Sequence, residues 1–224
     1  MKIRRSKKIV LKILIGFAGL VILYIFCIGI ACIPGLFLLS EEKTTTIDGV
    51  TTFEEAVLAC RGSGCEGWDL VEYAQKLTAR KFTYSRRNSW ESPEKAFARG
   101  QGYCVQQALV LNRIYKGMGI ESKVVHGKGD FPDSVIHGVS ELGGNFNHTW
   151  LEVTINGETL YVCPGSASNS PGNLDFTITG KVKPYTKIMH FFTYPGAILI
   201  NAIRDFRATR FRKESIPHPA QSGA

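Results

Sequence analysis

The sequence predicts an α+β protein in which one apolar N-terminal helix precedes a small domain. The run of residues 13–33 contains no charged side chain, and a helix of about 20 apolar residues crosses a bilayer. Capping patterns and helical periodicity then extend over residues 52–116. Beyond them, strand-like runs surround an Asn-Gly turn at 156–157, which is typical of an antiparallel hairpin. Helices that come first and a sheet that follows indicate the α+β class.

The N-terminal segment is predicted to anchor the chain in a membrane. Residues 1–12 carry six lysines and arginines, and the apolar run after them continues with few breaks to residue 39. Because basic residues beside a span resist translocation, we expect a cytoplasmic segment 1–12, a transmembrane anchor 13–39 and a domain outside the cytoplasm. The apolar core of a cleaved signal peptide is usually about 7–15 residues long. The longer run here favours an uncleaved single-pass anchor over a cleaved signal or a lipoprotein signal at Cys32.

The net charge of +8 is concentrated at the two ends of the chain. A second basic cluster follows an apolar stretch near the C-terminus, and acidic and basic residues nearly balance between the two ends. Basic segments beside apolar runs suit anionic lipid headgroups, whereas a nucleic-acid-binding domain carries a basic stripe. Membrane lipid is therefore an expected partner, and nucleic acid is not. The C-terminal cluster consists of Arg204, Arg207, Arg210, Arg212 and Lys213.

Three short helices are expected before residue 100, each beginning at an N-terminal capping pattern. Cys60 and Cys65 flank a loop with two glycines, and a disulfide or two free thiols are both compatible with that spacing. The predicted helices run from Thr52 to about Cys60, from Asp69 to about Arg80, and from Ser92 to Arg99.

Cys104 is the first residue that the pattern singles out. Gly100 and Gly102 lie shortly before it, and an apolar run free of helix breakers extends from it to Lys116, with Gly117 and Gly119 beyond. This predicts a tight turn into a largely buried helix that has Cys104 at its N-terminus. Unpaired N–H groups at that end favour a thiolate. A free cysteine is also often only a packed core residue, so a catalytic role requires a base nearby.

His148 opens the predicted hairpin and is the candidate for this base. Residues 122–126 are expected to form a strand, 127–146 a glycine-rich loop, and 148–155 and 158–162 two strands joined by the Asn-Gly turn. A two-residue turn pairs Ile155 with Glu158, Val153 with Leu160 and Trp150 with Cys163. Alternation places His148, Trp150, Glu152 and Cys163 on one face. The side chain at 163 is then near enough to orient the imidazole of His148.

The order and spacing of these residues resemble the transglutaminase-like superfamily over about residues 82–165. The resemblance implies the fold and catalytic layout of papain-like thiol enzymes, in which a cysteine attacks an acyl carbonyl, a histidine carries the proton and an aspartate orients the histidine. It assigns Cys104 as the nucleophile and His148 as the base, and it puts Cys163 where the family has the aspartate. The matching positions are Gly102-Tyr103-Cys104, Gln106, Ala108, Gly119-Ile120, Lys123-Val-Val125, Gly127, His148-x-Trp150, Glu152-Val153 and Pro164.

The presence of Cys163 in place of an aspartate leaves open whether the site is catalytic. A neutral thiol is a weak hydrogen-bond acceptor and does not stabilise an imidazolium as a carboxylate does. Three hypotheses are open. A Cys104–His148 dyad works with help from another carboxylate, Glu152 or Asp175; Cys163 is a redox partner of Cys104; or the domain is catalytically silent and binds peptides.

The predicted function is acyl transfer by a membrane-anchored thiol enzyme, as peptide or amide hydrolysis or as transamidation, on peptide or protein substrates outside the cytoplasm. The alternative is a catalytically silent peptide- or protein-binding module at the cell envelope. Both acyl-transfer reactions share one acyl-thioester intermediate, and neither requires a cofactor. The other histidines have no comparable setting and are interpreted as surface or loop residues without a metal site. They are His126, His137, His190 and His218.

The catalytic domain is expected over residues 43–187, and two segments follow it. Residues 188–203 are mostly apolar but short for a span, so 188–213 is predicted to lie in the membrane interface rather than to cross the bilayer or to pack onto the domain. Residues 214–224 contain two prolines and no apolar pattern, which predicts a disordered tail.

Overall fold

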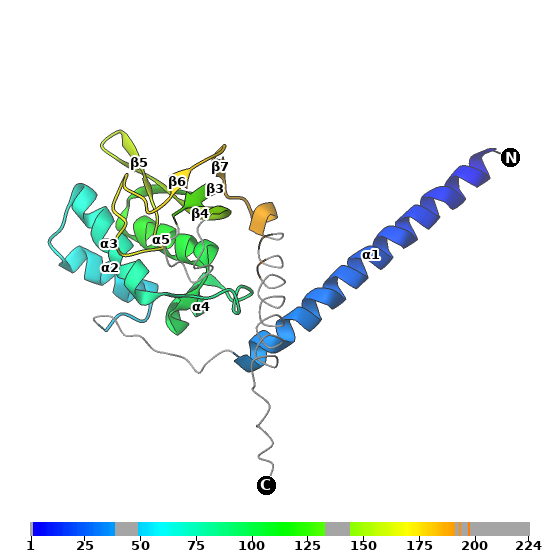
Figure 1. The fold of residues 1–224 in the computed structure, drawn as a ribbon, viewed down its shortest axis with the longest axis horizontal. Helices are drawn as coiled ribbons and strands as arrows, with labels where there is room; N and C mark the ends of the chain where they lie inside the picture. The colour runs from blue at the N-terminus through cyan, green and yellow to red at the C-terminus, as the bar shows by residue number, and fades with distance from the viewer. Residues whose placement is uncertain (1, 39–48, 133–143, 191–192, 194–196, 198–224) are drawn as a thin grey trace, which may run out of the picture.

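The computed structural model describes residues 2–38, 49–132, 144–190, 193 and 197. Helix α1 (Lys2–Leu38) is continuous (Figure 1). Its stretch Lys8–Ile30 has 23 residues, 18 of which in succession have a mean hydropathy of 2.8, and none of it is buried against the rest of the described chain. At about 1.5 Å per residue this stretch is about 35 Å long, and the hydrocarbon core of a bilayer is about 30 Å thick. Helix α1 is therefore long and apolar enough to cross a membrane.

Three helices begin the domain: α2 (Phe53–Gly62), α3 (Gly67–Lys81) and α4 (Pro93–Arg99). The predicted capping box of α2 is present, since the Thr52 hydroxyl accepts from the Glu55 N–H and the Glu55 carboxylate accepts from the Thr52 N–H. The predicted start of α3 at Asp69 is wrong. The Glu66 carbonyl already accepts the first helical hydrogen bonds, so Asp69 lies inside the first turn, where a negative charge is favourable.

Helix α5 (Cys104–Met118) begins and ends where the glycine pattern predicts. The short strands β1 (Thr83–Tyr84) and β2 (Gln101–Gly102) pair in parallel just before it. A Cβ on Gly102 would lie 2.9 Å from the Phe82 ring and 3.0 Å from the Gln106 side chain. Only glycine therefore fits this approach to Cys104. At the other end, Gly119 closes α5 in the left-handed conformation, with φ of 81°.

The main sheet is antiparallel, in the order β5-β4-β3-β6, with β7 also paired to β3. The predicted hairpin register is confirmed, since Ile155 pairs with Glu158 and Val153 with Leu160. Asn156 and Gly157 have φ of 51° and 85°, as a type I′ turn requires. The strands are β3 (Glu121–Phe131), β4 (Gly144–Ile155), β5 (Glu158–Val162), β6 (Thr177–Ile178) and β7 (Lys183–Pro184).

The predicted glycine-rich loop 127–146 is wrong at both ends, because β3 continues to Phe131 and β4 begins at Gly144. The glycines in this part of β3 make room for aromatic rings. A Cβ on Gly127 would lie 2.9 Å from the Trp150 ring, and one on Gly129 would lie 2.6 Å from the Phe176 ring. Glycine inside a strand often marks such a close approach.

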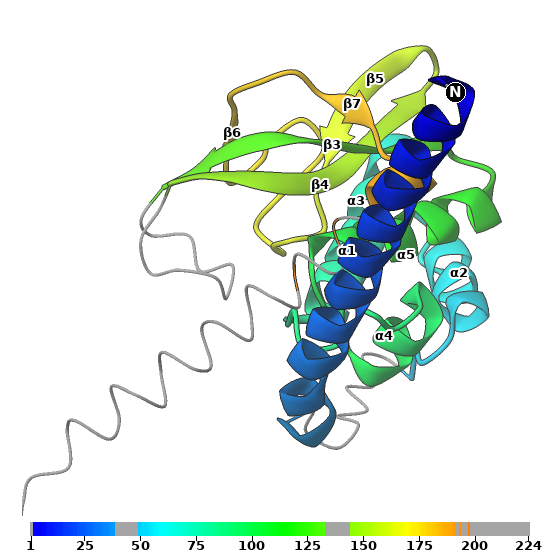
Figure 2. The ribbon, with the colours of Figure 1, turned by 90° about the vertical axis from the view of Figure 1, so that its right-hand side faces the viewer.

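The two faces of the sheet pack into different clusters. Leu151, Val153 and Val162 join the core formed with α2, α3 and α5. Trp150, Cys163 and Phe176 belong to a second cluster with Val125 and Phe131. Figure 2 shows the long paired strands β3 and β4 on one side of the domain and the helices on the other.

The remaining sequence predictions have mixed outcomes. Cys60 and Cys65 are free thiols, and Cys60 is buried. Most of the segment 188–213 and all of 214–224 lie outside the described residues, so the interfacial helix stays a prediction. Ala197, from that segment, is buried in a cluster with Tyr103, Cys104 and Val105.

Candidate active site

Cys104 is the first residue of α5, and the backbone before it is tightly held. The Tyr103 N–H donates to the Gln106 side-chain oxygen at 3.1 Å. The Gln106 amide nitrogen in turn donates to the carbonyls of Asn88 and Glu91, at 2.9 and 3.0 Å. Gln106 is 1% exposed. It therefore ties the turn that presents Cys104 to the segment that precedes α4.

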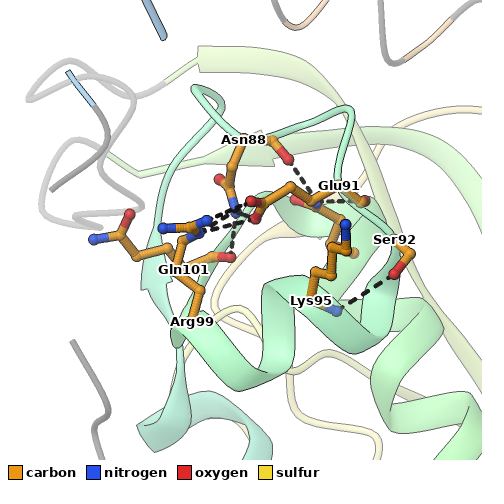
Figure 3. A network of polar contacts seen from close by, with 7 residues as sticks. Asn88, Glu91, Ser92, Lys95, Arg99 and Gln101 are labelled. Atoms are coloured by element: carbon orange, nitrogen blue, oxygen red, sulfur yellow. Dashed lines mark hydrogen bonds and ion pairs between the residues drawn. The ribbon is translucent and has the colours of Figure 1, made fainter. Parts of the chain in front are cut away.

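A partly buried polar network supports the same segment (Figure 3). Asn88 donates to the Gln101 carbonyl at 2.7 Å and to the Glu91 carboxylate at 3.0 Å. Arg99 contacts both Glu91 oxygens, with its shortest approach at 2.6 Å. Ser92 caps α4 by accepting from the Lys95 N–H. Because a forked ion pair of this kind is rigid, the network holds residues 88–91 against the strand that leads into Cys104.

The Cys104 thiol is 8% exposed, and its burial raises its pKa. Three features oppose that rise: first the positive charge of Arg86, then hydrogen bonds with Thr149 and with the Val105 backbone. Burial is the dominant effect, so the thiol form is favoured before a substrate enters.

His148 lies on β4 among aromatic side chains. Its ring meets those of Phe131 and Phe176 edge-on, at centroid distances of 5.3 and 5.0 Å, and stacks with Trp150 at 6.0 Å. Its Nε2 is 3.2 Å from the Sγ of Cys163. The structure therefore brings His148 and Cys163 into direct contact, and the surrounding rings hold the imidazole in one orientation.

Cys163 is 1% exposed, and burial raises the pKa of its thiol. The Gly165 N–H donates to its sulfur at 3.4 Å and opposes the rise, whereas electrostatic interaction with Asp175 and with Cys104 adds to it. Cys163 is thus a neutral thiol at neutral pH. Asp175 and Cys104 therefore both act electrostatically on the Cys163 thiol.

Of the two carboxylates considered as helpers, Asp175 is the better placed. Both of its carboxylate oxygens are buried, and its N–H donates to the Asn169 side-chain oxygen at 2.8 Å. The Asn169 amide donates to the Cys163 carbonyl at 3.2 Å, which ties the two segments together. Glu152 instead pairs across the strands with Tyr161 and helps to raise the pKa of that phenol.

A pocket of about 300 Å³ lies beside Cys104. Two neighbours of His148, Asn147 and Thr149, line it, whereas His148 and Cys163 do not. Alternation along β4 turns the side chain of His148 toward the aromatic cluster instead. The lining consists of Tyr84, Arg86, Tyr103, Cys104, Val105, His126, Asn147, Thr149, Thr193 and Ala197.

The pocket contains two functional candidates that the sequence did not reveal. His126, interpreted as a surface or loop residue, is half-buried on β3, and its Nδ1 is 2.9 Å from the Thr149 hydroxyl. Burial lowers the pKa of His126, so the ring is neutral at neutral pH. Arg86 lies over the Tyr84 ring, with its guanidinium carbon 5.8 Å from the ring centroid. If β3 had been predicted at its full length, the alternation of its side chains would have indicated that His126 faces inward. No local sequence pattern indicated a role for Arg86.

His190 accepts or donates through Nδ1 to the Tyr185 hydroxyl at 3.0 Å, and His137 and His218 lie outside the described residues. In the part of the chain that the structure describes, no three potential metal-ligating side chains lie together.

Residues 58–162 match the sequence profile of the transglutaminase-like superfamily. The chain contains a transglutaminase-like domain. Helices before an antiparallel sheet, with Cys104 at a helix N-terminus and His148 on a central strand, agree with the predicted fold class.

Two solved structures are weakly similar to this chain. The crystal structure of a TGase is 15% identical, with a TM-score of 0.37 over 50% of this chain and 30% of that one. A candidate cysteine protease from Cytophaga hutchinsonii is 12% identical, with a TM-score of 0.39 over 60% of this chain and 49% of that one. This chain thus spans less than half the length of either. No curated protein matches its sequence.

Proposed function

We propose that this protein is a membrane-anchored thiol enzyme that transfers acyl groups of peptide or protein substrates outside the cytoplasm. The observation that carries the proposal is the position of Cys104, which lies at the N-terminus of α5 and lines a pocket of about 300 Å³. His148 is on the strand that borders this pocket, and Cys163 holds its Nε2. A cysteine and a histidine in a transglutaminase-like domain are the nucleophile and base that acyl transfer requires.

In the proposed reaction, His148 takes the proton of Cys104 as the sulfur bonds to the substrate carbonyl carbon. The carbonyl oxygen becomes an oxyanion, which free N–H groups at the start of α5 are suited to stabilise. The carbon–nitrogen bond then breaks, and the amine leaves with the proton from His148. Water or a second amine attacks the thioester, the carbon–sulfur bond breaks, and the proton returns to Cys104. Water yields hydrolysis, and an amine yields transamidation.

The proton on His148 must be on the correct nitrogen for this reaction. For Nδ1 to act as the base, Nε2 must carry the hydrogen and donate it to the Cys163 sulfur. The Cys163 thiol then needs a separate acceptor for its own hydrogen, and the buried Asp175 carboxylate is the nearby candidate. Asp175 would thereby act through Cys163 as a positioning residue and not as a direct partner of the substrate.

A second candidate is a silent peptide-binding domain, and two observations favour it. Burial raises the pKa of the Cys104 thiol, and His148 does not line the pocket. Alkylation separates the two functions, because only the thiolate reacts quickly with electrophiles. The protein in detergent is treated with iodoacetamide at pH 7, and each cysteine is followed by peptide mass spectrometry.

An enzyme should show fast labelling at Cys104, with amidase or transamidase activity lost in Cys104→Ala and the circular dichroism unchanged. The matched control is Cys65→Ala, which removes a half-exposed thiol outside the pocket. Labelling of Cys104 no faster than that of an unfolded thiol, together with no activity, would establish the silent domain. Full labelling in Cys104→Ala but none in Cys163→Ala would show that the nucleophile is Cys163.

The location of the domain is proposed from the N-terminal charge and α1. Basic residues before the span should stay in the cytoplasm, so protease added to intact cells or spheroplasts should degrade residues 43–187. Protection of this region until the membrane is opened would reverse the topology.

A further inference from the structure

Arg86 provides the only formal charge among the described residues that line the pocket. The other described lining residues include no aspartate or glutamate, and burial lowers the pKa of His126, which keeps that ring neutral. The described part of the pocket lining beside Cys104 therefore carries a positive charge. A charged, half-enclosed pocket concentrates ligands of the opposite sign.

The Arg86 guanidinium is held in this position. The N–H of Ser85 donates to the Gly102 carbonyl at 3.1 Å, which fixes the residue before Arg86 to the turn that leads into Cys104. The guanidinium lies over the Tyr84 ring, and such stacking orients arginine without neutralising its charge.

No carboxylate of the described chain neutralises Arg86. Two other arginines have acidic partners, since Arg99 pairs with Glu91 and Arg113 pairs with Glu94. Within residues 49–132 and 144–190, the ion pairs do not include Arg86. An unpaired charge in a partly buried site is costly, so this arrangement indicates a ligand that brings its own anion.

We propose that Arg86 binds a carboxylate of the acyl donor, so that the substrates of this site carry an acidic group beside the carbonyl that Cys104 attacks. This inference rests on the proposed function, because it uses the same pocket. The guanidinium fork matches a carboxylate with two parallel hydrogen bonds. A pocket of about 300 Å³ is at the small end of ligand sites, so the carboxylate and the carbonyl belong to the same residue or to adjacent residues.

Arg86 has a rival role, because its charge also favours the thiolate of Cys104. Two reagents of the same size separate the roles. Iodoacetate carries a carboxylate, and iodoacetamide is its neutral counterpart. In both reactions the sulfur–carbon bond forms as the carbon–iodine bond breaks, iodide leaves, and the thiol proton passes to solvent. An effect on the thiolate changes both rates equally, whereas carboxylate binding changes their ratio.

The experiment measures alkylation rates of the full-length protein in detergent at pH 7, with Cys65 as the internal reference thiol. The ratio of iodoacetate to iodoacetamide rates at Cys104 should exceed that at Cys65, and Arg86→Gln should lower it about tenfold, as expected for a lost charge-assisted hydrogen bond. Arg87→Gln, which removes the same charge one residue away, should leave the ratio unchanged. Equal loss of both rates in Arg86→Gln, or an unchanged ratio, would overturn the inference.

If Cys104 of the wild type reacts with neither reagent, the proposed function fails, and binding decides the inference separately. Saturation-transfer NMR with N-acetylglycine and with N-acetylglycinamide needs no reactive thiol. The carboxylate form alone should give a signal, and Arg86→Gln should abolish it. Equal signals from the two compounds, or a carboxylate signal that survives in Arg86→Gln, would show that Arg86 recognises no carboxylate.

Discussion

Replacing Cys163 with aspartate should convert the site into a complete Cys–His–Asp triad. The Cys163 sulfur is 3.2 Å from Nε2 of His148, so a carboxylate on the same Cβ can accept that hydrogen directly. A carboxylate both selects the tautomer and stabilises the imidazolium, and together these effects contribute up to about 10⁴-fold in rate. The thiol already supplies part of the orientation, so we expect a gain of about 10- to 100-fold.

Asp175 limits this gain, because its charge acts on position 163. Two neighbouring buried carboxylates do not both ionise readily, and one of them then keeps a proton. The double variant Cys163→Asp/Asp175→Asn should therefore be faster than Cys163→Asp alone. Cys163→Asn, which matches the new side chain in shape without its charge, should give no gain.

The assay is the pH dependence of Cys104 alkylation by iodoacetamide, with amidase turnover measured beside it. In Cys163→Asp the new carboxylate should stabilise the thiolate–imidazolium pair and move the labelling profile to lower pH. A folded Cys163→Asp protein that loses all activity, or whose labelling profile does not move, would refute the assignment of position 163. If Cys163 is instead a redox partner, an oxidant should reversibly silence the wild type, and Cys163→Ser should be resistant.

Three further predictions concern the fold and the second histidine. Gly129→Ala places a Cβ 2.6 Å from the Phe176 ring and should lower the free energy of unfolding by about 1–3 kcal/mol. Urea unfolding of the full chain measures this loss. The control Gly62→Ala, which has open space around it, should lower the free energy of unfolding less. Hydrogen bonds with Thr51 and Thr52, of which the one from the Thr51 hydroxyl has the largest effect, lower the pKa of Glu55 to about 2. The contribution of Glu55 to stability is therefore present above pH 4.5 and lost as the pH falls toward 2. The pH dependence of Tm in wild type and Glu55→Gln checks this, and equal slopes below pH 4.5 would contradict it. His126→Phe removes the partner of the Thr149 hydroxyl and should slow Cys104 alkylation without shifting its pH dependence. A shift in the pH dependence of alkylation would instead make His126 the base.

The features predicted correctly depend on residues a few positions apart. The Thr52–Glu55 capping box, the left-handed glycine after α5 and the Asn-Gly turn each form within one turn of chain. Cys104 at a helix start and Cys163 beside His148 follow from such local geometry, because a two-residue turn determines which side chains share a face. These local signals were enough to identify the transglutaminase-like domain.

The features that the sequence did not reveal arise from contacts between distant segments. Gly127 and Gly129 suggested a loop, but they lie in a strand because rings from Trp150 and Phe176 cross them. The pocket forms where residues 84–86, β3 and β4 meet around Cys104, and no short-range pattern brings Arg86 or His126 there. Asn169 bridges the backbones of Cys163 and Asp175, a link between segments that no sequence pattern indicated. Charge and access at the site depend on these long-range contacts, because a side chain's pKa depends on the groups that fold around it.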